Sequence, residues 1–590
     1  MSFFNRHYKL FSLLLIYLLG LISYFNSFRG EFVFDDVNTI IRQENLRNLD
    51  DIAKIWQISH SRFIPYLSYA LNYHFNDLDP PGYHAVNFII HILNAFLVYF
   101  LVLKAGKSLR QSFGQAKILA VLTAVIFAIH PIETQAVTYI SQRFTLLAAF
   151  FYLTTLILYL RRTFISYLLS LLTLILAMLS KENSYTLPLA ILVTDLFFSG
   201  GIEVKNRFFR ILPYFLISAA VFSFIYLPGY ADPISRISSM NMLDNIKITR
   251  TEYLLTQINV VRTYLRLLIF PVNQTIDYDY PISRNFWEPQ VFYSLGIIIF
   301  VIIIAVKQLK KRPLFAFGMA IFFITLVIES SIFPIKDVIF EHRLYLPSVG
   351  FILAASTLMM RIKNQYHFYG IAILLLITLS YMTFKRNYIW LSEYNLWTDA
   401  VLKSPKKARV HYNLGVASYG INKYEEAKKE LQTTIELDPF YSDVYSNLGT
   451  IYIGEKKFDQ ALFIYQKGLE KNYYDTKVRA GLAAYYSQTG EYDHAADQYL
   501  TILKYDPNNA FALNDLGMVY FNQNKKEEVI SALEQAISLN PNYETAVQNL
   551  ANTYFHFGEY TQAKGYYLRL LGINPNNAQA IYSLRELDKK

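Results

Sequence analysis

Long apolar segments alternate with short polar stretches over the first 384 residues of the chain. Each segment comes close to the ~20 apolar residues with which an α-helix crosses a bilayer. Eleven of them are found, at Leu10–Phe25, Tyr83–Leu103, Ala116–Ile129, Phe144–Leu160, Phe164–Leu179, Tyr185–Phe198, Phe208–Leu227, Val291–Val306, Leu314–Phe333, Leu346–Met360 and Phe368–Phe384. The pattern predicts a polytopic helical membrane domain over residues 1–384, with about eleven spans.

A twelfth stretch, Tyr253–Phe270, is apolar on only part of its surface. Arg262 and Arg266 are four residues apart and therefore share one face of a helix. This arrangement favours an amphipathic helix at the membrane surface over a further span.

A different period begins after Lys385. Leucine recurs every 34 residues, at Leu414, Leu448, Leu482, Leu516 and Leu550. Other residues recur in step with it, at Tyr452, Tyr486, Tyr520 and Tyr554, at Pro439, Pro507, Pro541 and Pro575, and at Ala427, Ala461, Ala495 and Ala563. This is the tetratricopeptide pattern of two helices per repeat, with small residues at the helix crossing. It predicts a junction and half repeat over residues 385–407, five repeats over 408–577 and a capping helix over 578–590, so the fold class is all-α.

Positive charges between the apolar segments indicate the orientation of the membrane domain. If the N-terminus is cytoplasmic, every short cytoplasmic segment is basic, as the positive-inside rule expects. The residues concerned are Arg6, Lys9, Lys104, Lys107, Arg110, Lys117, Arg161, Arg162, Lys205, Arg207, Arg210, Lys307, Lys310, Lys311, Arg312, Arg361 and Lys363. An odd number of spans then places the repeats outside the cytoplasm. We predict an integral multi-pass membrane protein with extracytoplasmic repeats.

Composition narrows the classes of function. Of the 590 residues, 53% are hydrophobic and only 17% are charged, which is typical of a membrane protein. The absence of cysteine excludes disulfides, thiolate-bound zinc, iron–sulfur clusters and thiol nucleophiles. Much of the basic charge behind the net +10 lies in short loops, where it follows topology, so we predict no nucleic-acid partner.

Four polar clusters fall on the extracytoplasmic side, each at the end of an apolar segment. They are Asp35-Asp36, His130-Pro131-Ile132-Glu133-Thr134-Gln135 with Arg143 beyond it, Lys181-Glu182-Asn183-Ser184, and Glu341-His342-Arg343-Leu344-Tyr345-Leu346-Pro347. Taken singly, each also has a structural interpretation as a helix cap, a helix stop, an interfacial ion pair or a solvated turn. Random placement would scatter such clusters over both faces, so their convergence on one face indicates a functional site.

The residue types in these clusters suit transfer from a lipid-linked phosphate. A carboxylate can act as a general base, and Arg or Lys at the membrane surface can hold a phosphate and stabilise it as it leaves. A nucleotide donor is not supported, because the chain has no GxxxxGK loop and the site faces away from the cytoplasm. Two carboxylates can bind a divalent cation, but no further ligands recur at metal-binding intervals, so no metal site and no firm cofactor are predicted.

Several motifs together resemble the transmembrane and tetratricopeptide repeat-containing O-mannosyltransferase-like family, within the GT-C class of membrane glycosyltransferases. They are the Asp35-Asp36 pair, HPIETQAVTYISQR from His130, Lys181-Glu182, YLRLLIFPVNQTIDYDYP over Tyr264–Pro281, EHRLYLPSVGF over Glu341–Phe351, and the junction residues Arg386-Asn387, Trp390, Leu396-Trp397, Ser404-Pro405 and Asn413-Leu414-Gly415. Each motif alone is weak, but the combination is specific and covers nearly the whole chain.

The resemblance implies an inverting transfer of a sugar, mannose or another hexose, from a polyprenyl-phosphate donor to Ser or Thr hydroxyls of extracytoplasmic proteins. It implies that Asp35 is the general base and that Asp36 positions donor or acceptor. Arg343 would bind the lipid phosphate, assisted by Lys181 or Arg143. The repeats would recruit the acceptor protein or a partner. The remaining pocket residues would be His130, Glu133, Glu182, Glu341 and His342.

One stretch departs from the family's usual form, because Glu133-Thr134-Gln135 stands where a second histidine and an acidic residue are common. The roles of Glu133 and Gln135 therefore stay open.

Two alternatives for the function also stay open. The chain could be a non-catalytic membrane scaffold whose repeats assemble an envelope complex, although eleven spans exceed what an anchor needs. The enzyme class could also hold with a glycan or lipid acceptor. A transporter is disfavoured, since charged residues are sparse within the segments and no inverted repeat is evident.

Overall fold

The computed structural model describes residues 2–109, 112–199, 203–226, 248–331, 334–335 and 337–587. These residues form helices and no β-strand, so the predicted all-α class is confirmed. The chain divides into two compact units, Met1–Pro405 and Lys406–Lys590. Three positions named in the sequence analysis, Arg110, Leu227 and Phe333, lie outside the described residues.

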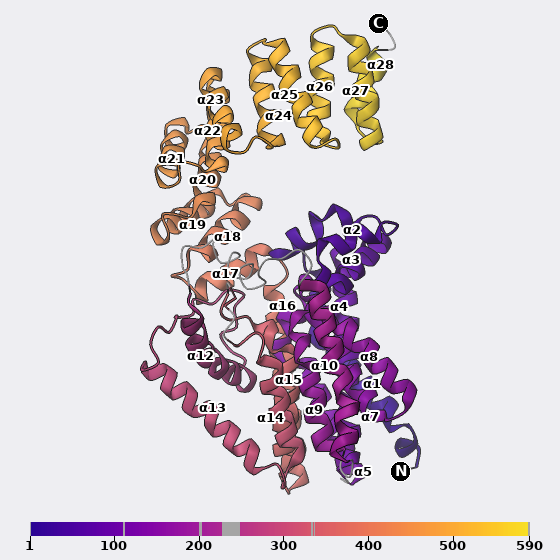
Figure 1. The fold of residues 1–590 in the computed structure, drawn as a ribbon. Helices are drawn as coiled ribbons and strands as arrows, with labels where there is room; N and C mark the ends of the chain where they lie inside the picture. The colour runs from indigo at the N-terminus through magenta and orange to yellow at the C-terminus, as the bar shows by residue number, and fades with distance from the viewer. Residues whose placement is uncertain are drawn as a thin grey trace. The chain divides into compact units, whose positions relative to one another are not determined.

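The first unit combines long helices with short helical turns (Figure 1). Its α-helices are α1 (Ser2–Tyr24), α2 (Ile52–Ile58), α3 (Phe63–Asn76), α4 (Pro80–Ser108), α5 (Phe113–Ile129), α6 (Thr134–Val137), α7 (Arg143–Arg161), α8 (Phe164–Met178), α9 (Leu187–Phe198), α10 (Val204–Tyr226), α12 (Arg250–Ile269), α13 (Pro289–Lys307), α14 (Pro313–Leu326), α15 (Tyr345–Met359), α16 (Gln365–Ile389) and α17 (Glu393–Lys403). The short turns are η1 (Phe25–Arg29), η2 (Val37–Ile41), η3 (Glu44–Leu46), η4 (His60–Arg62), η5 (Pro131–Glu133), η6 (Ile140–Gln142), η7 (Glu182–Thr186) and η9 (Glu341–Leu344).

Each of the eleven apolar segments coincides with a helix, namely α1, α4, α5, α7, α8, α9, α10, α13, α14, α15 and α16. In the described part of the chain, six helices are long and apolar enough to cross a membrane, or seven if the bent pair Gly114–Ile129 and Pro131–Val137 is one span. Phe164–Met178 and Pro313–Leu326 are apolar but shorter. The membrane character is thus supported, while the number of spans and the surface position of α12 stay predictions.

Local sequence signals explain where several helices of this unit begin. The Thr249 side chain accepts the Glu252 N–H, and the Glu252 side chain accepts the Thr249 N–H, which is a complete capping box at the start of α12. At the start of α8, the Thr163 side chain accepts the backbone N–H of Ser166 at 3.2 Å. At the start of α17, the side chain of Ser392 accepts the N–H of Asn395 at 3.2 Å.

The helices α14 and α15 pack closely because two glycines face each other. A Cβ atom on Gly318 would collide with the carbonyl of Gly350, and a Cβ atom on Gly350 would collide with the carbonyl of Gly318. Small residues allow this approach in a membrane, where helix association relies on direct packing. This contact helps to fix the start of α15, which follows the Glu341-His342-Arg343 turn.

The second unit is a solenoid of helix pairs (Figure 1). The helices are α18 (Ala408–Gly420), α19 (Tyr424–Leu437), α20 (Ser442–Gly454), α21 (Phe458–Lys471), α22 (Thr476–Thr489), α23 (Tyr492–Tyr505), α24 (Ala510–Asn522), α25 (Lys526–Leu539), α26 (Glu544–His556), α27 (Tyr560–Ile573) and α28 (Ala578–Leu587). All five leucines of the 34-residue period are buried, so the period marks the core between successive helices.

Candidate functional site

Asp35 and Asp36 are adjacent but have opposite environments. The carboxylate of Asp36 is fully buried and accepts the backbone N–H of Ser141 at 2.6 Å and that of Val33 at 3.1 Å. Asp35 is exposed, and its backbone N–H donates to the hydroxyl of Tyr139 at 3.1 Å. Asp36 therefore fastens the loop to the region around η6, and this attachment leaves the Asp35 carboxylate accessible.

Burial raises the pKa of Asp36 to about 7, and the neighbouring Asp35 adds to the rise. The backbone N–H groups of Val33 and Ser141 act in the opposite direction because they stabilise the ionised form. A carboxyl group in this setting is suited to holding the loop in place. The more accessible Asp35 is better placed to meet a substrate.

Lys181 is held by an acidic residue that sequence reasoning did not identify. Its ammonium group lies 3.0 Å from the carboxylate of Glu329 and donates to the Thr145 hydroxyl at 3.1 Å. Both charged side chains are largely buried, with 10% and 8% exposed. Burial lowers the pKa of Lys181, and Glu329 opposes that effect. The ion pair keeps a cation at a buried position where an unpaired charge would be costly.

Glu182 is paired with Arg62, which sequence reasoning also missed. The guanidinium donates to both carboxylate oxygens, at 3.1 and 3.2 Å, and the Ser61 hydroxyl donates to one of them at 3.1 Å. Burial alone would raise the pKa of Glu182, but Arg62 outweighs it and the pKa is lowered. The side chain of Arg62 is 40% exposed. Arg343, taken as a whole residue, is only 3% exposed, so Arg62 is the more accessible of the two arginines.

Glu341 is an internal acceptor rather than an exposed carboxylate. It accepts the hydroxyl of Tyr278 at 2.6 Å, the backbone N–H of Thr275 at 2.8 Å and the amide of Gln274 at 3.0 Å. Burial raises its pKa, and Arg386 together with these donors limits the rise. These bonds connect η9 to the stretch that follows α12.

The two residues after Glu341 bring a guanidinium and an imidazole into the buried region. Arg343 donates to the backbone carbonyls of Asp337 at 2.7 Å and Val338 at 3.1 Å. The backbone N–H of His342 donates to the side-chain oxygen of Gln135 at 2.7 Å, and its ring stacks on Phe340 at 5.0 Å. The first of these bonds joins the second and fourth polar clusters of the sequence directly.

Three cations converge on His342. Burial lowers its pKa well below the usual range, and the charges of Lys181, Arg343 and Arg62 lower it further. Arg62 and Arg343 also act on Lys181. The cations of Arg62 in η4, Lys181 just before η7 and Arg343 in η9 therefore share one region, as a site for an anionic group requires.

Tyr66 connects this cationic region to the Asp35 loop. Burial raises the pKa of the Tyr66 phenol, and Asp35 and Glu182 raise it further while Arg62 lowers it. Residues of the Asp35, Lys181 and Glu341 clusters, together with Arg62, therefore influence the same two side chains or their neighbours, Tyr66 and His342. The predicted convergence of the clusters on one face of the membrane itself stays a prediction.

Arg143 is committed to internal bonds. Its five N–H donors are directed at the side-chain oxygens of Asn87 (2.7 Å), Asn72 (2.9 Å) and Ser68 (3.4 Å) and at the carbonyls of Tyr83 (3.1 Å) and Ser68 (3.2 Å). The residue is fully buried. Its predicted contact with a phosphate stays untested, and its visible role is to join α3, α4 and α7.

The His130 stretch contains buried polar atoms with no hydrogen-bond partner among the described residues. Both carboxylate oxygens of Glu133 and the amide nitrogen of Gln135 are in this state, as is Nδ1 of His342. His130 itself is bonded, through Nδ1 to the N–H of Ile132 and through Nε2 to the carbonyl of Leu268, each at 3.2 Å. Such orphaned groups are rare in proteins and favour an additional polar occupant.

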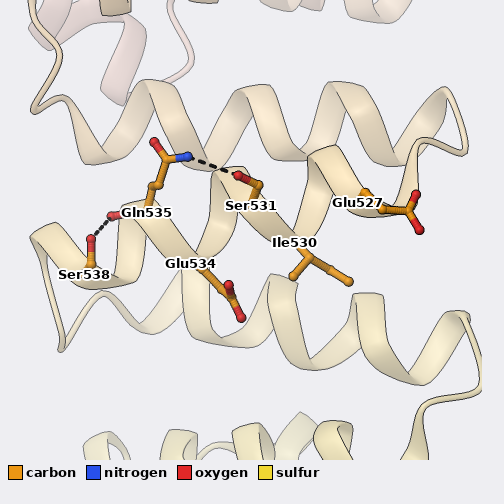
Figure 2. Close-up of a pocket in the computed structure, with 6 residues that line it drawn as sticks. All are labelled: Glu527, Ile530, Ser531, Glu534, Gln535 and Ser538. Carbon is orange, nitrogen blue, oxygen red and sulfur yellow. Dashed lines mark hydrogen bonds between the residues drawn. The ribbon is translucent and has the colours of Figure 1, made fainter.

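No group of three or more His, Cys, Asp or Glu side chains is positioned to hold a metal ion within the described ranges. One hollow lies away from these residues, on α25 of the repeat unit (Figure 2). It has a volume of about 490 Å³ and is lined by Glu527, Ile530, Ser531, Glu534, Gln535 and Ser538. Because this lining contains no cation, it does not suit a phosphate group.

One signal in the sequence could have found Arg62. Under the predicted topology it lies in an outer loop, where the positive-inside rule disfavours arginine. The signal is weak, because the same loop also contains Arg29, Arg42, Arg47 and Lys54. Glu329 is likewise an acid at the end of an apolar segment. Neither signal identifies the partner, because Arg62 and Glu182 are 120 residues apart.

The fold and these polar groups define a polytopic helical membrane protein with a tetratricopeptide solenoid. Models of the tetratricopeptide repeat match residues 408–441, 442–470, 510–543 and 545–577. Among solved structures, PilF of Pseudomonas aeruginosa (21% identity, TM-score 0.28) covers 31% of this chain and 83% of its own. The tetratricopeptide protein YrrB (18% identity, TM-score 0.26) covers 32% and 97%.

Curated relatives extend the similarity across the first unit. Protein O-mannosyl-transferase F38B6.6 of Caenorhabditis elegans is 30% identical over 73% of this chain and 63% of its own length. The human protein O-mannosyl-transferases TMTC3 and TMTC1 are 24% and 25% identical over 70% and 71% of this chain and 50% and 54% of their own lengths. The matched part of the chain thus corresponds to between half and two thirds of the length of these relatives. The matches confirm the predicted resemblance to the transmembrane and tetratricopeptide O-mannosyltransferase-like family.

Proposed function

We propose that this protein is a membrane glycosyltransferase of the GT-C type. It transfers mannose or another hexose from a polyprenyl-phosphate donor to Ser or Thr hydroxyls of proteins outside the cytoplasm. The observation that carries the proposal is an exposed carboxylate, Asp35, on a loop anchored by Asp36 and linked electrostatically through Tyr66 to a group of cations. The names of the curated relatives support the same reaction class.

In the proposed step, Asp35 takes the proton of the acceptor hydroxyl. The hydroxyl oxygen attacks C1 of the sugar from the face opposite the phosphate, and the bond between C1 and the phosphate oxygen breaks. The electron pair of that bond leaves with the lipid phosphate, and the configuration at C1 is inverted. Asp36 acts through the loop: its bonds to Val33 and Ser141 hold Asp35 in place.

Arg343 and Lys181 are the proposed partners of the lipid phosphate, and we add Arg62 to them. All three act on His342, so their charges reach one region. Arg62 has the most exposed guanidinium of the group and binds the Glu182 carboxylate in the two-point geometry that also suits phosphate. The unpartnered oxygens of Glu133 and the amide of Gln135 are candidates to bond sugar hydroxyls.

The tetratricopeptide repeats are proposed to recruit the acceptor protein or a partner through the surface formed by successive helices. This role requires the repeats and the Asp35 loop to lie on the same side of the membrane, which the proposed topology provides. A reporter fused after Asn577 should be active only outside the cytoplasm. Cytoplasmic activity at that position would overturn the arrangement.

The test is transfer by the purified protein from a polyprenyl-phosphate-linked mannose to a Ser/Thr-rich peptide. Wild type should transfer, and Asp35→Asn should lower turnover by ~10²–10⁴-fold, the usual contribution of a general base. Asp50→Asn is the matched control, because Asp50 belongs to the same outer loop and its backbone N–H donates locally, to the side-chain oxygen of Asn48 at 2.9 Å.

The competing functions give different results in that experiment. Transfer to a glycan or lipid but not to a peptide would keep the enzyme class and change the acceptor. No transfer with any hexose donor or acceptor, together with intact phenotypes in Asp35→Asn and Asp36→Asn strains, would favour the scaffold.

A further inference from the structure

We propose that Glu393, the first residue of α17, is a positioning residue that holds the Asp35 loop in its working shape. This inference rests on the proposed function, because it assigns a task to a residue outside the reacting groups. In the sequence, Glu393 is part of the half repeat that precedes the tetratricopeptide array. In the structure, it belongs to the first unit and reaches the loop that carries Asp35.

The backbone next to Asp35 is held in an unusual conformation. Phe34 has φ = +54°, in the left-handed region that non-glycine residues seldom adopt. A bulky residue persists there only when its surroundings hold it, and such positions gather at functional sites. Phe34 directly precedes Asp35, so its backbone angles set the direction in which the Asp35 side chain leaves the loop.

Glu393 supplies the strongest contact to this residue. One carboxylate oxygen accepts the backbone N–H of Phe34 at 2.6 Å, and the other accepts the indole N–H of Trp397 at 2.5 Å. Trp397 in turn packs edge-on against the Phe34 ring, with the ring centroids 5.3 Å apart. A single carboxylate thus fixes both the backbone of Phe34 and the aromatic side chain that confines its ring.

Two further contacts tie the same stretch to the chain around Glu393. The backbone N–H of Glu31 donates to the carbonyl of Leu391 at 3.1 Å. Trp390 stacks on Tyr139 at 5.4 Å, and the hydroxyl of Tyr139 accepts the backbone N–H of Asp35. The loop is therefore held from one side by Asp36 and from the other side by the segment 390–397.

A general base must be placed to within a fraction of an ångström to take its proton efficiently. Loss of the hydrogen bond between Glu393 and the Phe34 N–H should therefore lower the turnover number. Donor binding should not weaken, because Glu393 is an acid and is not one of the residues proposed to bind the donor phosphate. A residue that only stabilised the fold would change the amount of folded enzyme and leave its turnover number and KM unaltered.

The experiment compares Glu393→Ala, Glu393→Gln and a control, Asp399→Asn, in the full-length protein. Asp399 is an acid on the same helix, but its ion pairs are with Arg386 at 2.8 Å and Lys403 at 2.6 Å, away from the loop. The first measurement is hydrogen exchange of the peptide covering residues 31–37. Glu393→Ala should speed exchange at Phe34 and Asp35 roughly tenfold, Glu393→Gln less, and Asp399→Asn not at all.

The second measurement is kcat and donor KM in the transfer assay. Glu393→Ala should lower kcat by about tenfold or more with little change in donor KM. Glu393→Gln should recover part of the loss, because its amide oxygen can still accept the Phe34 N–H. Asp399→Asn should match wild type.

The two measurements separate the possible failures. Unchanged exchange in Glu393→Ala would overturn the inference whatever the activity. Faster exchange with unchanged kcat in an active enzyme would also overturn it and leave the proposed function standing. Faster exchange in a protein whose wild type transfers no sugar would overturn the proposed function, while the result would still support Glu393 as the residue that holds the loop.

Discussion

The two units of this protein use buried charge in different ways. In the first unit, Asp36, Glu133, Arg143, Asp195 and Glu341 have no exposed surface at all. In the described part of the repeat unit, no Asp, Glu, Lys, Arg or His is less than 4% exposed, and the most buried of them is Arg479. The repeat unit instead buries the leucines and alanines of its 34-residue period.

This contrast distinguishes what a stable helical core needs from groups that need another explanation. Burying an ionised group costs several kcal/mol unless it is paired, so a fold needs a reason to keep many such groups. The repeat unit shows that the chain can build a stable all-helical core without them. The proposed site offers a reason for part of these polar groups, and substitutions in the two units should therefore have different consequences.

The largest effect that we expect from the proposed cations is that of Arg343→Ala. It should lower kcat/KM by about a hundredfold, as removal of a charge-stabilising group does elsewhere, with Arg343→Lys recovering only part. The measurement is steady-state transfer by purified protein. Arg361→Ala, in an exposed position of a predicted cytoplasmic loop, is the control. Full activity in Arg343→Ala would remove this residue from the site.

A smaller effect is expected for Arg62→Ala. The half-exposed guanidinium is proposed to share the donor phosphate, so donor KM should rise roughly tenfold. Arg42→Ala, an exposed arginine of the same outer loop, tests whether any nearby positive charge suffices. The double variant Arg62→Ala/Glu182→Gln tests whether the loss comes only from an unpaired Glu182. A normal KM in the double variant would mean that Arg62 serves Glu182 and not the donor.

The repeat unit should respond to shape and not to charge. A Cβ atom on Gly449 would overlap the ring of Tyr465, whereas one on Gly454 would meet nothing within 4 Å. Gly449→Ala should therefore destabilise the α20–α21 pair by about 1–3 kcal/mol, and Gly454→Ala should not. Hydrogen exchange of these helices is the measurement. Transfer to a short peptide should stay normal in both variants. Reduced transfer in Gly449→Ala alone would contradict the expectation that packing in the repeat unit does not affect the reaction.

The smallest effect concerns pH. The pKa of Asp36 is about 7 in the folded protein, above the ordinary value of 3.8, so the fold favours the protonated form. Its contribution to stability is then complete below pH ~4 and is lost as the pH rises through about 7. Wild type should unfold at a lower temperature at pH 8 than at pH 6. Asp36→Asn should show a weaker dependence, and an equally steep one would assign the effect to other groups.

Much of the fold follows from patterns that are local in sequence. All eleven apolar segments coincide with helices because a continuous apolar run satisfies its backbone only as a helix in a bilayer. The repeats could be predicted because five units place the same residue types at the same helix contacts. The span count was harder to predict, since α8 and α14 are apolar but short. Whether these two helices cross the membrane depends on the helices packed around them rather than on their own composition.

The candidate site was predictable only in part. The polar motifs at segment ends pointed to Asp35, Lys181 and Arg343, because such residues need a reason to be there. Arg62 is marked only weakly, by its place in an outer loop, and Glu393 has no comparable signal in the sequence. Glu393 contacts Phe34 across 359 residues of sequence, and a contact of that kind depends on how helices pack. The different environments of Asp35 and Asp36 were likewise invisible in an Asp-Asp dipeptide.

The place of α17 has a consequence for how such proteins can be recombined. A chimaera that takes its repeat array from a relative should be joined after Pro405, where the two compact units meet in sequence. A join before Glu393 would import a foreign residue at the position that touches Phe34. Exchange of repeat arrays among such proteins is therefore expected to tolerate a crossover after Pro405 better than one before Glu393.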